Sequence, residues 1–513
     1  MPPVHNVLIV GAGLTGLATA LALHRSCRSF SIVVLEQSKS LRNEGAALTL
    51  FPNAWRVLDA LGVADVLRPH FISIMGSRVR SSKDGRVIKE FQNSDYPGGP
   101  HEMRQVERKQ LLAALYNPIP KGVVRFNSRV TAVRKPVGAA GPQAAAGVTQ
   151  VELEDGTIYS TKVLLGCDGG GSVIAKWAGL TKPQPVGQIV IRGLCKCEQG
   201  ALHNLEPVYQ HVIGKGVRLG LTPVTHDKVY WFLVFNASSS PAAQAARSGT
   251  TQYITDPLQT REEALQHTKG WPQDVVKWIE KTPIEGLNRG IIRDRCTWSV
   301  TPIRHSVLMS IMTPAAAALR FFWNKPAAAT VPLSNAITLV GDAWHPMTPN
   351  LAQGGCIALE DSITVARKLH QALNNINKPN KKNNNNNVKQ LHKTITTLSH
   401  SATTTLTTTT TNSSCMKSNY KLNLEEEELL WAEQMPRVIA ALAEYQRERR
   451  FRTFVITVKS HLFGSFLGWD SSLVCFLRDK VILPLTFSAS AVFGVTTYDC
   501  GQLVRFDNTQ SSA

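Results

Sequence analysis

The chain has 513 residues, a formal net charge of +19 and the composition of a globular protein. This length predicts two or three domains and a large core. The basic residues are spread along the chain and no nucleic-acid-binding motif accompanies them, which argues against nucleic acid and favours anionic small molecules as partners.

The nine cysteines fit neither a disulfide framework nor a metal site. Cys195 and Cys197 have no second Cys or His pair at zinc spacing, so we expect no metal. Polar His5 and Asn6 directly precede the first apolar strand and leave no room for a signal or transit peptide. These features predict reduced thiols and a cytoplasmic protein.

The N-terminus carries the pattern of a dinucleotide site. A strand (4–10) leads into Gly11-x-Gly13-x-x-Gly16, a helix (17–25) and a second strand (31–35) that ends in Glu36. Gly11 permits a tight turn, Gly13 lets a pyrophosphate approach the backbone, and Gly16 lets the helix pack on the strand. Glu36 would accept from ribose hydroxyls, which disfavours a 2′-phosphate. FAD or NAD is therefore the expected ligand, rather than NADP.

Two segments follow that could serve the same site. Gly45-Ala46-Ala47 would let a ring approach the backbone, and a helix begins near Pro52. The run 101–115 has helical periodicity, which places Arg104 and Arg108 on one face. For an isolated arginine pair of this kind, a solvated surface is the commoner explanation.

A second strand–acid–glycine corner occurs at 163–171. A hairpin around Asp155-Gly156 precedes a buried strand (163–165), then Cys167-Asp168-Gly169, and a helix (173–177). This corner could pair with the first nucleotide turn, and taken alone it is as often a structural turn.

From residue 188 to 236 the apolar period changes to two. We predict three antiparallel strands, at 208–213, 217–223 and 228–235. One face of such a sheet could cover a cofactor, and Tyr209, His211, Tyr230 and Trp231 are candidate pocket residues, although aromatic residues on strands more often belong to the core. A helical segment (256–281) and a strand (296–302) follow.

The segment 337–369 predicts an anion site. A buried strand (337–340) breaks at Gly341-Asp342, and a loop with two prolines leads to a helix that starts at Gln353-Gly354-Gly355. The helix N-terminus favours negative charge, and the acid suits a ribityl or ribose hydroxyl.

The C-terminal part begins with an Asn- and Thr-rich tract (374–423) that has almost no large apolar residues, and we expect a disordered insertion there. A helix (425–452) resumes, with acids at its start and bases at its end. The apolar run 481–495 is too short and interrupted to span a membrane. Docking on the protein is expected, with peripheral membrane contact as the alternative.

These motifs together resemble the flavoprotein aromatic-hydroxylase family, the FAD-dependent monooxygenases. The resemblance rests on the N-terminal glycine motif with Glu36, on Cys167-Asp168-Gly169 and on GDAWHP at 341–346. The longer runs GKGVRLGLTP, KVYWFLVFN and YQRERRFR are similar to its plant branch, related to zeaxanthin epoxidases. The chain departs from the family pattern at Gly170-Gly171-Ser172, at Ala352 (where glycine is common) and across 309–330.

The resemblance implies an α/β fold: a Rossmann-like FAD-binding domain with an antiparallel substrate domain and a helical C-terminal region. It also implies which residues surround FAD. FAD would be bound by Gly11, Gly13, Gly16, Glu36, Arg108 and Asp342, and Asp168 and Gly169 would lie near its pyrophosphate with a role in NAD(P)H use. The pyrimidine end of the flavin would lie near Pro349, Gly354 and Gly355.

The predicted division of the chain has five parts. They are residues 1–180 (first FAD-binding part), 181–302 (substrate domain), 303–373 (return to the FAD-binding domain), 374–423 (insertion) and 424–513 (helical region).

The implied activity is NAD(P)H-dependent hydroxylation or epoxidation of a small, aromatic or unsaturated, lipophilic substrate by O₂, through a C4a-hydroperoxyflavin. Protein would supply orientation and a dry environment for the cofactor's chemistry. No side chain is an evident catalytic acid or base. Two alternatives remain: a flavin reductase or oxidase without an oxygenated product, and a non-catalytic interaction protein.

Overall fold

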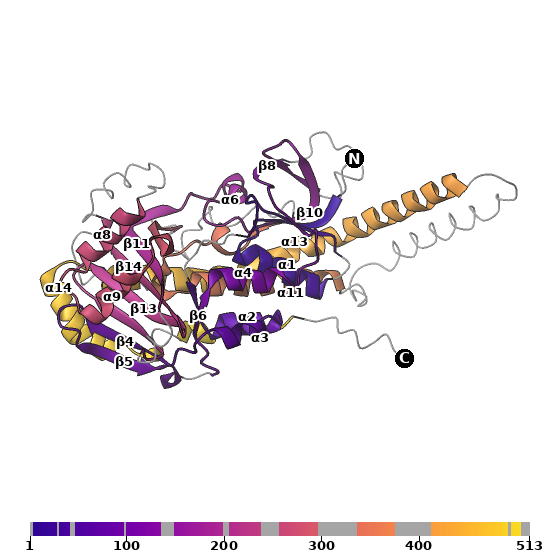
Figure 1. The fold of residues 1–513 in the computed structure, drawn as a ribbon. Helices are drawn as coiled ribbons and strands as arrows, with labels where there is room; N and C mark the ends of the chain where they lie inside the picture. Colours follow the sequence, from indigo (N-terminus) through magenta and orange to yellow (C-terminus); the bar gives the residue numbers. More distant parts are fainter. Residues whose placement is uncertain are drawn as a thin grey trace.

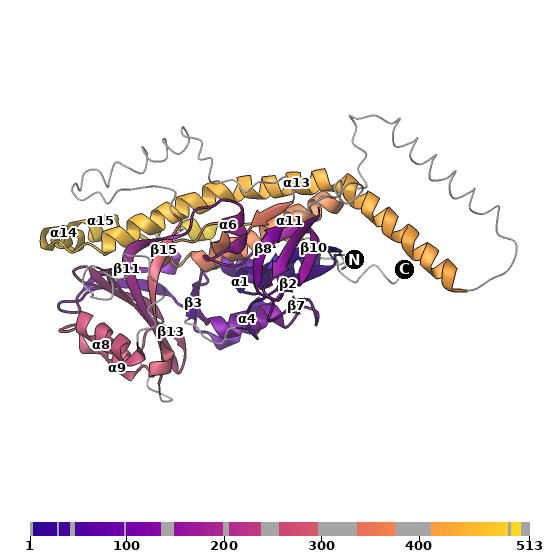
Figure 2. The same cartoon turned by 90° about the horizontal axis from the view of Figure 1, so that it is seen from above.

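The computed structural model describes residues 4–27, 30–41, 47–96, 99–134, 148–197, 205–237, 256–295, 336–374, 412–490 and 494–503. Two sheets lie side by side in these ranges, and a long C-terminal helix runs along both (Figures 1 and 2). The fold is the α/β arrangement expected from the sequence, with an antiparallel-rich second sheet and a helical C-terminal region.

The first sheet contains the N-terminal strand at its centre. Its order is β7-β2-β1-β10-β9-β8, and β16 pairs with β10. β1 runs parallel to β2 and to β10, and β10 runs parallel to β16. The bounds are β1 Val4–Val10, β2 Ile32–Leu35, β7 Val124–Arg125, β8 Val130–Arg134, β9 Thr149–Leu153, β10 Ile158–Gly166 and β16 Ile337–Leu339. Because helices cover this sheet, its central strands are apolar on both faces.

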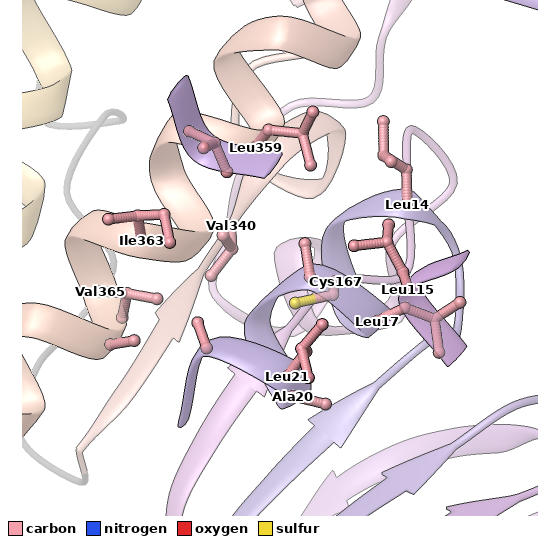
Figure 3. Close-up of a cluster of buried hydrophobic side chains, with 14 of the residues drawn as sticks. Leu14, Leu17, Ala20, Leu21, Leu115, Cys167, Val340, Leu359, Ile363 and Val365 are labelled. Carbon is pink, nitrogen blue, oxygen red and sulfur yellow. The ribbon is translucent and has the colours of Figure 1, made fainter. Parts of the chain in front are cut away.

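Helices α1 (Leu14–Ser26) and α11 (Gly354–Asn374) pack along each other next to this sheet. Leu17 and Leu21 from α1 and Leu359 and Ile363 from α11 belong to one buried cluster, with Val340 between the two helices (Figure 3). All five side chains are fully buried. The core therefore joins residues more than 300 positions apart and fixes the starts of both helices. The other helices in this part of the structure are α2 Pro52–Ala60, α3 Ala64–Leu67, α4 Arg108–Tyr116 and α6 Val173–Trp177.

The second sheet has the order β15-β11-β14-β13-β12-β4-β5. Its bounds are β4 Gly76–Ser81, β5 Val87–Gln92, β11 Gln184–Lys196, β12 Val208–Ile213, β13 Val217–Thr225, β14 Lys228–Asn236 and β15 Leu287–Asp294. The three strands predicted between 208 and 235 are present in antiparallel order. β4 and β5, from the first hundred residues, extend this sheet through a parallel β4–β12 pair, which the periodicity did not indicate. Helices α8 (Pro257–His267) and α9 (Gln273–Lys281) cover one face.

The C-terminal part is dominated by α13 (Asn412–Leu467), which packs on α11. It is followed by α14 (Ser472–Leu477), a π-helical turn (Arg478–Ile482) and α15 (Leu483–Thr486). The beginning of the apolar run 481–495 docks on the protein: Phe487 stacks on Phe463, with ring centroids 5.7 Å apart. No helix in the described ranges is long and apolar enough to cross a bilayer.

Two predicted elements were wrong in part. The run 101–115 is not one helix: β6 (Arg104–Glu107) pairs with β3 (Ala47–Leu50) before α4 begins at Arg108. Pairing with β3 supplies hydrogen bonds that a local helix pattern does not reveal. Arg104 and Arg108 therefore do not share a helix face.

The predicted disordered tract is helical from Asn412 onward. Extending an existing helix fixes one residue per hydrogen bond, and neither glycine nor proline interrupts 412–435, so even weak helix formers continue α13. The remainder of the tract (375–411) lies outside the described residues. So do Gly45-Ala46, the predicted strand 296–302 and the segment 309–330.

Candidate active site

The glycine motif forms the turn between β1 and α1. Gly11 has φ +98°, and a Cβ there would lie 2.7 Å from the carbonyl oxygen of Cys167. A Cβ at Gly16 would lie 1.8 Å from the carbonyl oxygen of Gly11, so this glycine permits close packing of helix and turn. At Gly13 a Cβ would meet no atom within 4 Å, which leaves the backbone open to a ligand.

Glu36 follows β2 and holds this turn in place. Its Oε2 accepts from the backbone N–H of Ala12 at 2.7 Å, and its Oε1 accepts from Ser38 N–H at 2.9 Å. The side chain is buried. Since each carboxylate oxygen has a second lone pair, Glu36 retains the capacity to accept from a hydroxyl group.

Asp168 occupies the corner after β10. Its Oδ2 accepts from the backbone N–H of Val173 at 2.7 Å, at the start of α6. Its Oδ1 is buried and has no hydrogen-bond partner among the described residues. Burial raises the pKa of Asp168, although hydrogen bonds from Ser172 and the α6 backbone act in the opposite direction. An unsatisfied buried oxygen of this kind is open to a donor from a water or a ligand.

These corners enclose one cavity of about 390 Å³. It is lined by Gly11, Gly13, Glu36, Arg108, Asp168 and Gly169, together with Gln37, Ser40, Leu41, Leu112, Ser128 and Val130. Gly16 lies beneath the turn rather than in this lining. Asp342, Pro349, Gly354 and Gly355 are also outside it.

Electrostatics nevertheless links Asp342 to the cavity. Asp342 is accessible to solvent, yet the protein atoms packed around it raise the pKa of its carboxyl. The positive charges of His345, Arg108 and Arg295 oppose this rise. Arg108 lines the cavity as the first residue of α4, so the two predicted sites adjoin at this side chain.

Arg295 is a further candidate site residue, which the sequence did not indicate. Its guanidinium donates to the carbonyl oxygens of Ala343 (2.6 Å) and Trp344 (2.8 Å). Burial lowers its pKa, while the charges of Asp168 and Asp342 act to raise it. Arg295 thus carries a positive charge between both acidic corners. No motif surrounds it in the sequence, so only the three-dimensional arrangement identifies it.

The loop before α11 brings a second helix N-terminus to the site. A Cβ at Gly355 would lie 3.4 Å from Leu14 Cδ2, so the starts of α1 and α11 are adjacent. Both positive helix ends therefore point to the same region. Ala352, where the family commonly has glycine, adopts the left-handed conformation with φ +50°. Glycine adopts this conformation at less cost than alanine does.

Comparisons with known proteins identify this arrangement. Residues 5–211 match the family model described as "FAD binding domain". "Monooxygenase 2" of Arabidopsis thaliana is 32% identical over 371 residues, covering 72% of this chain and 77% of that protein. "3-hydroxybenzoate 6-hydroxylase" of Klebsiella oxytoca is 27% identical over 380 residues, covering 72% and 81%.

The chain belongs to the FAD-dependent monooxygenases of the aromatic-hydroxylase type. A solved structure agrees in fold: Klebsiella pneumoniae HpxO, complexed with FAD and uric acid, superposes with a TM-score of 0.65 at 19% identity over 96% of each chain. The finer relation to zeaxanthin epoxidases stays a prediction.

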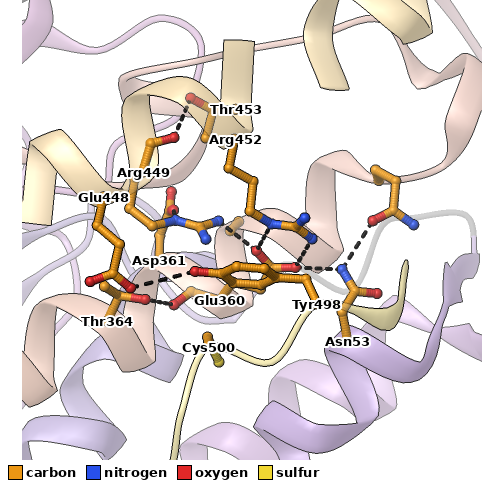
Figure 4. A network of polar contacts seen from close by, with 12 residues as sticks. Asn53, Glu360, Asp361, Thr364, Glu448, Arg449, Arg452, Thr453, Tyr498 and Cys500 are labelled. Carbon is orange, nitrogen blue, oxygen red and sulfur yellow. Dashed lines mark hydrogen bonds and ion pairs between the residues drawn. The ribbon is translucent and has the colours of Figure 1, made fainter. Parts of the chain in front are cut away.

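In this monooxygenase, a buried ion-pair network holds the Gly341 loop. Asp361 of α11 accepts from the backbone N–H of Gly341 (3.0 Å) and binds the His345 ring at 2.5 Å. Arg449 donates to Asp361 (2.5 Å) and to Glu360 (2.6 Å), and all three side chains are fully buried (Figure 4). Burial alone would raise the pKa of Asp361, but the charges of His345 and Arg449 bring it below its usual value. Two arginines of the run YQRERRFR, Arg449 and Arg452, therefore belong to this network.

One face of the second sheet packs against the FAD-binding part of the monooxygenase. Tyr209 and Tyr230 belong to the main core cluster, with Phe232 packed against it. His211 lies beside Tyr209, with ring centroids 4.6 Å apart, and its Nδ1 has no hydrogen-bond partner among the described residues. Gly220 leaves room for Phe232, whose ring a Cβ would meet at 2.1 Å.

Trp231 is not on that face, which corrects one of the four pocket candidates. It packs in the second cluster with Val275 and Trp278, and its Nε1 donates to Thr282 at 2.8 Å. Successive residues of a strand point to opposite faces, so Tyr230 and Trp231 could not both line one pocket.

Proposed function

We propose that this monooxygenase uses NAD(P)H and O₂ to transfer one oxygen atom to a small, aromatic or unsaturated, lipophilic substrate. The observation that carries the proposal is the single cavity in which six of the predicted cofactor residues meet. The choice between hydroxylation and epoxidation depends on the substrate.

The residues around the cavity fit FAD. We propose that Gly11, Gly13 and the start of α1 bind the pyrophosphate, and that Glu36 accepts from ribose. The open backbone at Gly13 and the remaining lone pairs of Glu36 support this. Asp168 Oδ1 and the adjacent Gly169 would meet a donor of the cofactor or of NAD(P)H, since this buried oxygen otherwise lacks a partner among the described residues.

The riboflavin half would extend toward the Gly341 loop. Asp342 would accept from a ribityl hydroxyl, with Arg108 and Arg295 balancing its charge. Pro349 and the helix start at Gly354 and Gly355 would face the pyrimidine end of the ring. There the positive end of α11 would stabilise negative charge. FAD, when bound, supplies the redox chemistry with O₂.

The substrate would lie between the flavin and the second sheet. We propose residues 181–302, joined by strands β4 and β5, as the substrate domain, with the rest of 1–180 and 303–373 holding FAD. Tyr209, Tyr230 and Phe232 give this face aromatic character, which suits a flat, apolar substrate. We assign no catalytic acid or base. On this proposal, the protein orients the substrate and excludes water.

The first test is the visible spectrum of the purified protein and its response to NADH and NADPH in air. We expect bound flavin that is bleached by one of them, and substrate-dependent incorporation of labelled oxygen. Oxidation of the nucleotide without incorporation would favour the reductase or oxidase alternative. Colourless protein that does not take up FAD would overturn the proposal and favour an interaction protein.

A variant pair tests the assigned site. Arg108→Met removes a charged donor from the cavity, and we expect FAD affinity to fall about 10- to 100-fold, as for the loss of a hydrogen bond to a charged group. Lys109→Met changes the next residue, which is exposed and does not line the cavity, and should leave affinity unchanged. Equal affinities of the two variants, measured by flavin fluorescence, would refute the role of Arg108.

A further inference from the structure

Apolar side chains gather on the outer surface of α14, the π-helical turn and α15. Five of them are exposed, with relative accessibilities of 69% (Leu473), 58% (Phe476), 40% (Leu477), 43% (Val481) and 79% (Leu485). Their spacing of 3, 4, 8 and 12 residues from Leu473 puts them on one side of a helix. We call these five residues the C-terminal ridge. The helix that carries the first three of them, α14, lies at one end of the molecule (Figures 1 and 2).

The opposite side of the same segment is anchored in the protein. Arg478 is fully buried and donates to the carbonyl oxygens of Leu467 (2.8 Å) and Gly214 (3.0 Å). Leu483 is buried in a cluster with Ile213 and Val79. Since these contacts hold the segment on the edge of the second sheet, the ridge faces outward as part of the fold.

Basic groups and one further apolar residue surround the ridge. Lys89 on β5 donates to the carbonyl oxygen of Pro484 at 3.0 Å, and Lys215 donates to Ser472 Oγ at 3.1 Å. Lys480 is exposed within the ridge segment itself. Val87 on β5, the strand that contacts α15, is 44% exposed. Three ammonium groups therefore border the apolar side chains, and the one carboxylate within the turn, Asp479, is paired with Arg478.

We propose that the C-terminal ridge docks on the surface of an anionic lipid membrane. Single exposed leucines are ordinary, but a contiguous apolar set marks an interaction site. A short helical segment with apolar residues outward and lysines beside them is the arrangement that inserts into the headgroup region. The net charge of +19 adds attraction to anionic lipid. This inference does not depend on the identity of the substrate.

The experiment uses the full chain with FAD and vesicles of phosphatidylcholine, with or without phosphatidylserine. We expect sedimentation with the phosphatidylserine vesicles, weakened by salt. The triple variant Leu473→Ser, Phe476→Ser, Leu485→Ser should lower the vesicle partition coefficient at least about tenfold, because each large apolar side chain contributes several-fold. The matched control is Val66→Ser with Leu258→Ser, which removes side chains of similar exposure (61% and 52%) elsewhere on the surface.

Two outcomes would overturn the proposal. One is absence of vesicle binding, or equal binding by the triple variant and the control. The other is concentration-dependent self-association without lipid that the triple variant abolishes, which would make the ridge an interface between two copies. Unchanged FAD content in all variants shows that the fold is retained.

Discussion

Burial of His211 makes the stability of the folded protein depend on pH. Burial, with the nearby charge of Arg218, lowers the pKa of His211 to about 3. In the unfolded chain a histidine titrates near pH ~6.5. Between these values the unfolded state binds more protons than the folded state, so stability falls as pH decreases through this window.

We therefore expect acidification from pH ~6 to ~5 to reduce the unfolding free energy by up to about 1 kcal/mol through this residue. His211→Gln should flatten that part of the curve. His226→Gln, which changes an exposed residue in the β13–β14 turn, should leave it unchanged. Denaturant unfolding across this pH range measures the difference, and parallel curves for the wild type and His211→Gln would contradict it.

At the residue scale, the sequence predicts side chains that come together when they are close in the chain. Gly11, Gly13 and Glu36 meet because a strand, a turn and a helix fix their positions within 36 residues. The sequence did not indicate the position of Arg295, because its partners lie 48 and 49 residues later in the chain. For Trp231 the strand pattern was sufficient, because adjacent residues of a strand point to opposite faces and Trp231 directly follows Tyr230.

Among the elements, α11 and α13 depend on each other through buried charge. Glu360 accepts from Arg449, from Arg452 and from Asn53 on α2, each at 2.6 Å. Removing Arg449 would leave two fully buried acids with less compensating charge, and loss of one partner of a buried pair costs about 3–5 kcal/mol. The network thus couples α11, which holds the Gly341 loop, to the C-terminal helix α13.

Arg449→Met should accordingly lower the unfolding free energy by about 3–5 kcal/mol. Arg447→Met, an exposed position on the same helix, should change it by less than about 0.5 kcal/mol. Chemical denaturation of both proteins measures these values. Similar losses in the two variants would mean that the helix, rather than the ion pair, is sensitive.

Element prediction worked where the pattern was periodic and isolated, as for α6, whose bounds 173–177 match the expectation. It failed where a distant strand decided the conformation. β6 takes its hydrogen bonds from β3, about 57 residues earlier, so a helical apolar pattern at 101–115 was overridden. The beginning of α13 shows the converse, because cooperativity extends a helix into a polar sequence.

For the whole molecule, the cavity is a product of folding rather than of any one segment. Its lining runs from Val10 to Val173 and includes residues of β1, β2, α4, β8 and α6. In the unfolded chain these groups are dispersed, so FAD should bind the folded state alone. Binding of this kind stabilises the folded state by mass action.

Free FAD at about 100 times its dissociation constant should thus add about 2.7 kcal/mol to the unfolding free energy. Glu36→Gln should reduce this increment at the same FAD concentration, because it weakens ribose binding. Glu36 also accepts from Ala12 and Ser38, so its substitution lowers the stability of the flavin-free protein as well. The difference between the unfolding midpoints of the flavin-free and the flavin-loaded protein separates the two effects.

Glu154→Gln, at an exposed turn, should retain the full stabilisation by FAD. An increment that Glu36→Gln leaves intact would mean that the ribose is held by other groups in the cavity.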